Sequence, residues 1–168
     1  GFLIQHGLTE APPPTHVINN RFLYYPQIES DPPVYYVAPA LVYVMLTESD
    51  TALQLYGMRL VSVIMFVALV VISMWVLRNV FPEDVQVTTI TATFISFLPM
   101  LTYMGGVLNN DILASVFTTL LFGVVVLILR FGFCWRRGVT ALSLVLLGIL
   151  TKHSTIWTIP IVAGVFLY

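Results

Sequence analysis

Charged residues are scarce in this 168-residue chain. Asp, Glu, Lys and Arg make up 9% of it, whereas hydrophobic residues make up 58%. A soluble domain with so few charges could not cover that much apolar surface. The composition therefore predicts an integral membrane protein.

The chain also lacks an excess of either charge and has almost no cysteine. Its formal net charge is -1, and its seven basic residues are scattered rather than clustered into a phosphate-binding patch. Cys134 is the single cysteine, so the chain has no internal disulfide and no CxxC or zinc-type spacing. These scarcities argue against a nucleic-acid partner and leave membrane lipid as the expected one.

Signals of a complete chain are missing at both ends. The sequence begins at Gly1 with no initiator Met and no basic signal-peptide region, and it stops at Tyr168 inside an apolar run. We therefore expect a longer polytopic protein that is incomplete at both termini.

The first third of the chain is expected to lie outside the membrane. Residues 1–33 are polar, aromatic and rich in proline, which favours an extended external loop. The next run, Val34 to Leu46, is shorter than the roughly 20 residues that a bilayer crossing needs. It is expected to be an interfacial helix with Tyr35, Tyr36 and Tyr43 at headgroup depth. Thr47 to Gly57 is expected to be a polar turn, so residues 34–56 form a juxtamembrane unit.

Residues 57–168 are expected to form a transmembrane helical bundle. Four apolar runs, the last of them interrupted by Lys152, predict an all-α fold with about 4–5 membrane helices. The last run fits either two short helices that meet at Lys152 or one tilted helix of about 30 residues. The runs are Leu60–Leu77, Val85–Met104, Ile112–Leu129 and Val139–Tyr168.

Arginine placement predicts the orientation of this bundle. Arg130, Arg136 and Arg137 lie in one expected loop, residues 130–138, and positive charge favours the cytoplasmic side. Counting crossings from that loop puts residues 1–56, Asp111 and Lys152 on the extracytoplasmic side.

Two charges within apolar sequence are the strongest site candidates. Asp111 is the one charge of a short polar break, Gly105 to Leu113, and an acid at such a position is either functional or a helix N-cap. Lys152 either reaches toward lipid headgroups or binds a lipid phosphate. An unpaired ammonium within the membrane costs at least about 2.5 kcal/mol, which favours the phosphate.

Four stretches together resemble the GT-C glycosyltransferases, especially the PMT-like branch that uses polyprenyl- or dolichyl-phosphate sugars. One is similar to the "HPPLYY" element of an external loop, and another to the "R-L" that opens the next spanning helix. A third resembles the second external loop with its acid, and the last looks like a "TK" between two short helices. In chain order they are Glu29–Tyr36, Gly57–Leu60, Pro99–Asp111 and Leu150–His153.

The resemblance implies sugar transfer from a polyprenyl-phosphate donor at the outer membrane face. It gives Asp111 the role of a supporting catalytic acid and Lys152 that of a donor-phosphate ligand, with Arg59 assisting unless Arg59 is only an interfacial anchor. In that family the first spanning helix and the principal acid precede the region that begins at Gly1. The chain alone is therefore expected to be inactive.

Three further residues are candidates with simpler alternatives. Glu29 and Asp31 are candidates for acceptor or metal binding, although carboxylates in a proline-rich loop are usually solvated. Asp31 also stands where relatives carry His, Lys or Gln. His153 is a candidate metal ligand, but a lone histidine is more often a structural hydrogen-bonding group. A requirement for a divalent metal stays open.

Two other function classes compete with the transferase. The chain could be a non-catalytic accessory subunit that packs against other membrane subunits of a larger complex. A transporter fits less well, because the sequence shows no inverted repeat and no paired broken helices beyond Lys152.

Overall fold

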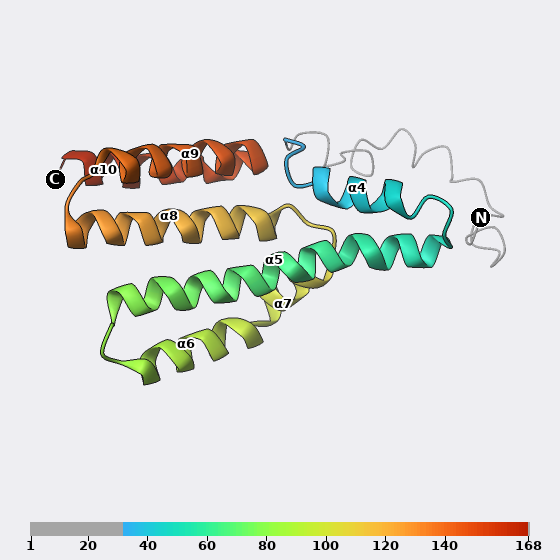
Figure 1. Ribbon diagram of the computed structural model, residues 1–168, viewed down its shortest axis with the longest axis horizontal. Helices are drawn as coiled ribbons and strands as arrows, with labels where there is room; N and C mark the ends of the chain where they lie inside the picture. Colours follow the sequence, from blue (N-terminus) through green and yellow to red (C-terminus); the bar gives the residue numbers. More distant parts are fainter. Residues whose placement is uncertain (1–31, 168) are drawn as a thin grey trace, which may run out of the picture. The chain divides into compact units, whose positions relative to one another are not determined.

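The computed structural model describes residues 32–167, and these residues form helices with no strand among them (Figure 1). This confirms the all-α membrane fold that the composition predicted. Candidate residues Glu29 and Asp31 lie outside the described residues. In chain order the helices are α4 (Val37–Met45), α5 (Thr51–Val80), α6 (Val85–Phe97), α7 (Pro99–Gly106), α8 (Asp111–Phe131), α9 (Trp135–Thr151), the 3-10 helix η1 (His153–Trp157) and α10 (Thr158–Leu167).

Two of these helices, α5 and α8, are long and apolar enough to cross a membrane, and the bent pair α6 and α7 supplies a third crossing if it is counted as one span. Helix α8 has 21 residues, so it extends about 32 Å at 1.5 Å per residue. That length matches the hydrocarbon core of a bilayer, which is roughly 30 Å thick.

Helix α5 begins earlier than the sequence suggested. Thr47 to Gly57 was expected to be a polar turn, but α5 starts at Thr51 and runs for 30 residues. The turn is compact because the Gln54 side chain caps it, with Nε2 donating to the Leu46 carbonyl oxygen at 2.9 Å. The "R-L" pair Arg59–Leu60 therefore lies inside α5 rather than at its start.

The second predicted span is a broken helix. It divides at Leu98 into α6 and α7, whose axes are bent by 58°. Pro99 occupies the first turn of α7, where its missing N–H is harmless. Thr102 Oγ1 donates to the carbonyl oxygens of Ser96 at 3.2 Å and Leu98 at 3.1 Å. This satisfies backbone acceptors that the break would otherwise expose to an apolar surrounding.

Helix α6 begins at Val85, the first residue of the predicted run Val85–Met104, and Pro82 lies in the preceding bend. The helix begins after Asp84, whose carboxylate accepts from the Val87 N–H at 3.0 Å. Side-chain oxygens at this position satisfy free N–H groups of a first helical turn.

The connection between α8 and α9 is shorter than the loop 130–138 that was predicted. Arg130 belongs to the last turn of α8, while Arg136 and Arg137 belong to the first turn of α9. Gly132, which has a φ of +79°, makes the turn possible. Arg130 Nη1 donates to the Asn79 carbonyl oxygen at 2.6 Å, so this end of α8 is fixed to the end of α5.

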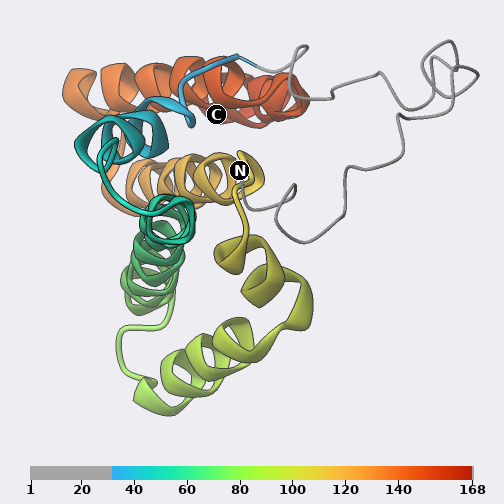
Figure 2. The same cartoon turned by 90° about the vertical axis from the view of Figure 1, so that its right-hand side faces the viewer.

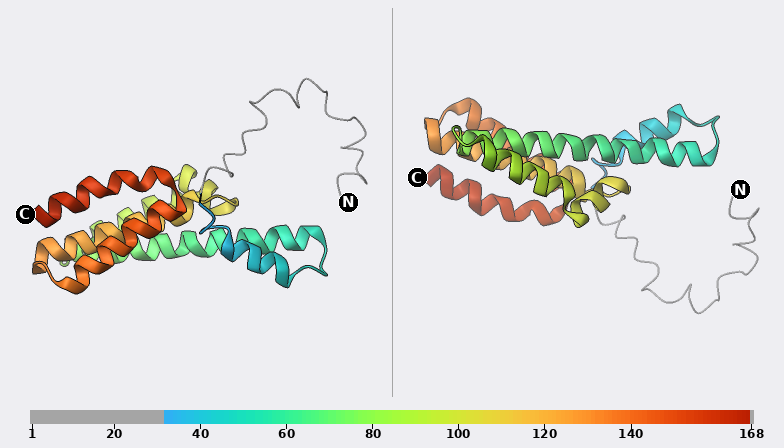
Figure 3. Two further views of the ribbon diagram at one scale, coloured as in Figure 1. Left: turned by 90° about the horizontal axis from the view of Figure 1, so that it is seen from above. Right: turned by 90° about the horizontal axis from the view of Figure 1, so that it is seen from below.

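The last apolar run forms two helices rather than one tilted helix. Helix α9 ends at Thr151, the short η1 follows Lys152, and α10 then runs back along the bundle (Figure 3). Gly148 permits this close turn, because a Cβ there would lie 3.2 Å from Thr155 Oγ1. Of the two interpretations left open by the sequence, the structure shows helices that meet near Lys152.

Helix α8 is the central element of the described bundle. It packs most extensively against α5 on one side and α9 on the other, and the end-on view shows it between the α9–α10 pair and α5 (Figure 2). One cluster of buried residues joins α8 to α9 and α10, including Leu121 and Ala141, and a second joins α8 to α5 and to Tyr35. The residues at both ends of α8 are therefore held by several neighbours.

Tyr35 differs from the prediction for the aromatic residues near α4. It was expected at headgroup depth, but its side chain is 0% exposed. Tyr43, in contrast, is 47% exposed. The expectation of a headgroup-facing aromatic is therefore wrong for Tyr35.

Candidate functional site

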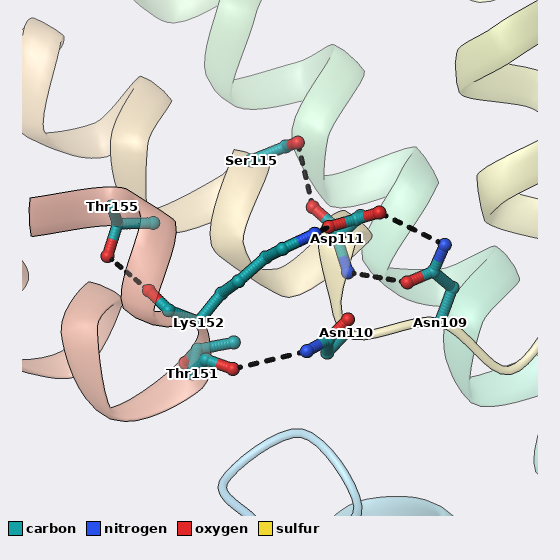
Figure 4. A network of polar contacts seen from close by, with 7 residues as sticks. All are labelled: Asn109, Asn110, Asp111, Ser115, Thr151, Lys152 and Thr155. Atoms are coloured by element: carbon teal, nitrogen blue, oxygen red, sulfur yellow. Dashed lines mark hydrogen bonds and ion pairs between the residues drawn. The ribbon is translucent and has the colours of Figure 1, made fainter. Parts of the chain in front are cut away.

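Asp111 and Lys152 form an ion pair between the start of α8 and the residue that follows α9 (Figure 4). The Lys152 Nζ donates to the Asp111 Oδ1. The side chains are 24% and 30% exposed, so both charges are partly withdrawn from the surroundings. The structure thus brings together the two site residues that the sequence placed on one face of the membrane.

Asp111 is not the N-cap of α8. Asn110 precedes the helix, and Asp111 is its first residue. The Asp111 carboxylate is held instead by Lys152 and by Asn109, whose Nδ2 donates to Oδ2 at 3.2 Å. An acid in the first turn is still stabilised by the positive end of the helix dipole.

Asn109 binds Asp111 twice. Its Nδ2 donates to the carboxylate, and its Oδ1 accepts from the Asp111 backbone N–H at 3.0 Å. The Ser115 hydroxyl donates to the Asp111 carbonyl oxygen at 2.8 Å from one turn further along α8. The backbone and the side chain of Asp111 are therefore both fixed.

The backbone next to Lys152 is also anchored. Lys152 has an extended conformation at the end of α9, and its N–H donates to the Gly148 carbonyl oxygen at 2.8 Å. Thr155 Oγ1 donates to the Lys152 carbonyl oxygen at 2.8 Å. These bonds hold the Lys152 backbone in place, so any movement of Lys152 is confined to its side chain.

The ion pair lies on the wall of a cavity of about 660 Å³ between α5, α6, α7, α8 and η1. The wall combines apolar side chains with hydroxyl groups from α5, α8 and η1. The apolar lining includes Leu69, Ile95, Leu101, Met104 and Phe122, whereas the polar lining includes Ser73, Ser115, Thr118, Thr119, Ser154 and Thr155. A cavity of this size, with an apolar wall and a few polar groups, suits an amphipathic ligand.

The other sequence candidates do not join this cavity. Arg59 lines a separate groove with Leu53, Tyr56 and Gly106. His153 is exposed in η1, and residues 32–167 contain no group of three or more His, Cys, Asp or Glu side chains that could hold a metal ion. The site within the described part of the chain therefore consists of Asp111, Lys152 and their neighbours.

Sequence reasoning missed the polar residues around the ion pair. Ser115, Thr118 and Thr119 follow Asp111 by four, seven and eight positions, a spacing that places them on one helix face. Asn109 precedes Asp111 by two, a pattern typical of side chains that bond nearby backbone. Both spacings are visible in the sequence and were signals that could have been used.

Comparisons with known proteins identify the family of this chain. Searches among curated proteins and among solved structures gave no match. A family model described as "Predicted membrane protein (DUF2142)" matches residues 19–168, which is most of the chain. The chain therefore belongs to the DUF2142 family of predicted membrane proteins.

Proposed function

We propose that this chain supplies the donor-phosphate side of a GT-C-type glycosyltransferase that takes a sugar from a polyprenyl-phosphate donor. The observation that supports this proposal best is the Asp111–Lys152 pair on the wall of a cavity that is lined by both apolar side chains and hydroxyl groups. A polyprenyl-phosphate sugar also combines an apolar part, its lipid chain, with polar parts, its charged phosphate and its sugar.

Lys152 has the chemistry that a departing phosphate needs. In the proposed reaction an acceptor hydroxyl oxygen bonds to the anomeric carbon of the sugar while the bond from that carbon to the phosphate oxygen breaks. The electron pair stays on the polyprenyl phosphate, and an ammonium close to that oxygen stabilises the added negative charge. The acceptor proton passes to a carboxylate.

Asp111 has a supporting role in this scheme. The resemblance assigns the principal proton-accepting role to another carboxylate, so Asp111 acts on Lys152 and on the orientation of the acceptor. Its carboxylate holds the ammonium at the cavity wall before the donor arrives. When the donor phosphate is bound, it shares the Lys152 ammonium with Asp111.

A non-catalytic subunit is the competing function, and the same ion pair would then only fix α8 to the end of α9. The two functions differ in whether Lys152 contacts a ligand. Binding of undecaprenyl phosphate to the full-length protein in lipid nanodiscs, followed by native mass spectrometry, measures this directly. We expect Lys152→Ala to weaken binding at least about tenfold, because it removes a charge-assisted contact to phosphate.

Transfer activity gives the second measurement. With polyprenyl-phosphate hexoses as donors, Asp111→Asn and Lys152→Ala should each reduce transfer by the full-length protein. The matched control is Arg136→Ala, in the first turn of α9 and so at the other end of that helix from Lys152. Undiminished transfer in the Asp111→Asn, Lys152→Ala double variant would overturn the proposal. Equal binding of undecaprenyl phosphate by the wild type and Lys152→Ala would support the subunit instead.

A further inference from the structure

Tyr35 is a buried tyrosine that the proposed chemistry does not use directly. Its ring is 0% exposed and packs edge to face on Tyr36, with 5.0 Å between the ring centroids. Its hydroxyl lies 2.6 Å from Ser62 Oγ on α5, and Ser62 is itself 0% exposed. A buried hydroxyl costs free energy unless it is hydrogen-bonded, and Ser62 provides one partner for the Tyr35 hydroxyl.

The Tyr35 hydroxyl also reaches the loop that leads into α8. It accepts a hydrogen bond from the Asn109 backbone N–H at 3.1 Å, across a separation of 74 residues. The same Asn109 holds the Asp111 N–H and the Asp111 carboxylate through its side chain. Two steps therefore connect the Tyr35 hydroxyl to the acid of the ion pair.

We propose that Tyr35 is a positioning residue for Asp111 and acts through Asn109. Tyr35 does not line the cavity that holds the ion pair, so we give it no catalytic role. By fixing the Asn109 backbone, it sets the direction of the Asn109 amide group. The amide group then determines where the Asp111 carboxylate meets Lys152.

The geometric part of this inference is independent of the reaction, whereas its effect on transfer rests on the proposed function. The alternative is that Tyr35 only fills the core between α5 and α8, in the cluster that contains Leu69, Ile112 and Val116. Removing the hydroxyl would then alter Asn109, its direct partner, and would leave Asp111 unchanged.

Amide hydrogen exchange separates these alternatives in the full-length protein. With selective ¹⁵N labelling of Asn and Asp, Tyr35→Phe should speed exchange at the Asn109 amide and, at least about tenfold, at the Asp111 amide. Asp111 has no direct bond to Tyr35, so its response reports the connection through Asn109. Tyr43→Phe, on the exposed side of α4, is the matched control and should change neither amide.

A second variant tests the route and guards against a general loss of structure. If Tyr35 acts through Asn109, the Asn109→Ala protein should already show fast exchange at Asp111, and adding Tyr35→Phe should increase it no further. Ser62→Ala, which keeps the Tyr35–Asn109 bond, should have a smaller effect than Tyr35→Phe. An unchanged Asp111 amide in Tyr35→Phe would overturn the inference, as would additive effects of Tyr35→Phe and Asn109→Ala.

Activity then distinguishes a failure of this inference from a failure of the proposed function. If the protein transfers sugar, Tyr35→Phe should lower kcat several-fold with little change in the KM for the donor, because Lys152 is retained. A changed Asp111 amide in a protein without transferase activity would support the positioning role and contradict the function. A lower kcat with an unchanged Asp111 amide would contradict the positioning role alone.

Discussion

The Asn110 side chain donates to the Thr151 carbonyl oxygen at 3.4 Å, so the residue before Asp111 is bonded to the residue before Lys152. Asn110 is 4% exposed and Thr151 is 0% exposed. The ion pair and this buried bond lie next to each other between the same two segments (Figure 4). Together they align the start of α8 with the end of α9.

The strength of the ion pair can be measured with a double-mutant cycle. Asp111→Asn and Lys152→Met should each lower the free energy of unfolding by about 1–3 kcal/mol, because each leaves a partly buried charge without its partner. The double variant should lose less than the sum of the two single changes. Thermal unfolding in detergent gives these values, and Glu83→Gln, at an exposed bend, is the control. Additive losses would show that the two charges do not stabilise each other.

Gly105 and Gly106 provide a matched pair for the packing of α7 on α5. A Cβ on Gly105 would lie 2.8 Å from the Phe66 Cβ, whereas a Cβ on Gly106 would meet nothing within 4 Å. Gly105→Ala should therefore destabilise the protein by about 1–3 kcal/mol, which is typical of overpacking. Gly106→Ala should change stability by much less. Equal unfolding temperatures for the two variants would contradict the close approach of α7 to α5.

Filling the cavity should block ligand binding without breaking the ion pair. Thr118 lines the cavity on α8, two turns from Asp111. Thr118→Phe should reduce binding of undecaprenyl phosphate at least about tenfold, since the larger ring occupies the space of the ligand. Leu129→Phe, at an exposed position of the same helix, should bind normally. Normal binding by Thr118→Phe would place the ligand elsewhere.

The orientation in the membrane can be tested with the single cysteine of the chain. Cys134 is exposed beside the arginines at the α8–α9 connection, which are expected on the cytoplasmic side. With any other cysteines of the full-length protein replaced, a membrane-impermeant maleimide should label Cys134 only after the cells are permeabilised. Glu48→Cys in a Cys134→Ser background should be labelled in intact cells. The reverse pattern would invert the predicted topology.

The sequence predicted those features of the structure that depend on residues close together in the chain. Helix α8 was evident because an uncharged run lies between Asp111 and Arg130, and the break at Lys152 was evident because one charge interrupts an apolar run. The start of α5 was missed because Glu48 and Asp50 make Thr47 to Gly57 look like one polar turn. The Gln54 side chain bonds carbonyl groups of the preceding turn, a contact that composition does not show.

Contacts between distant segments could not be predicted in the same way. Tyr35 near a membrane boundary has the same sequence signature whether it faces headgroups or lies buried against Ser62. Its partner Asn109 is 74 residues away, and no local pattern connects the two. The opposite charges of Asp111 and Lys152 made their contact predictable. A tyrosine hydroxyl and a backbone N–H have no comparable sequence signal, because every residue except proline has a backbone N–H.

The separation of Asp111 and Lys152 by 41 residues also affects how the protein is made. At roughly 5–20 residues per second of synthesis, Asp111 leaves the ribosome about 2–8 seconds before its counter-charge. During that interval α8 has to enter the bilayer with an acid paired only to Asn109 and to the positive end of its own helix dipole. Insertion of α8 therefore depends on the insertion machinery until α9 is complete and Lys152 has been synthesised.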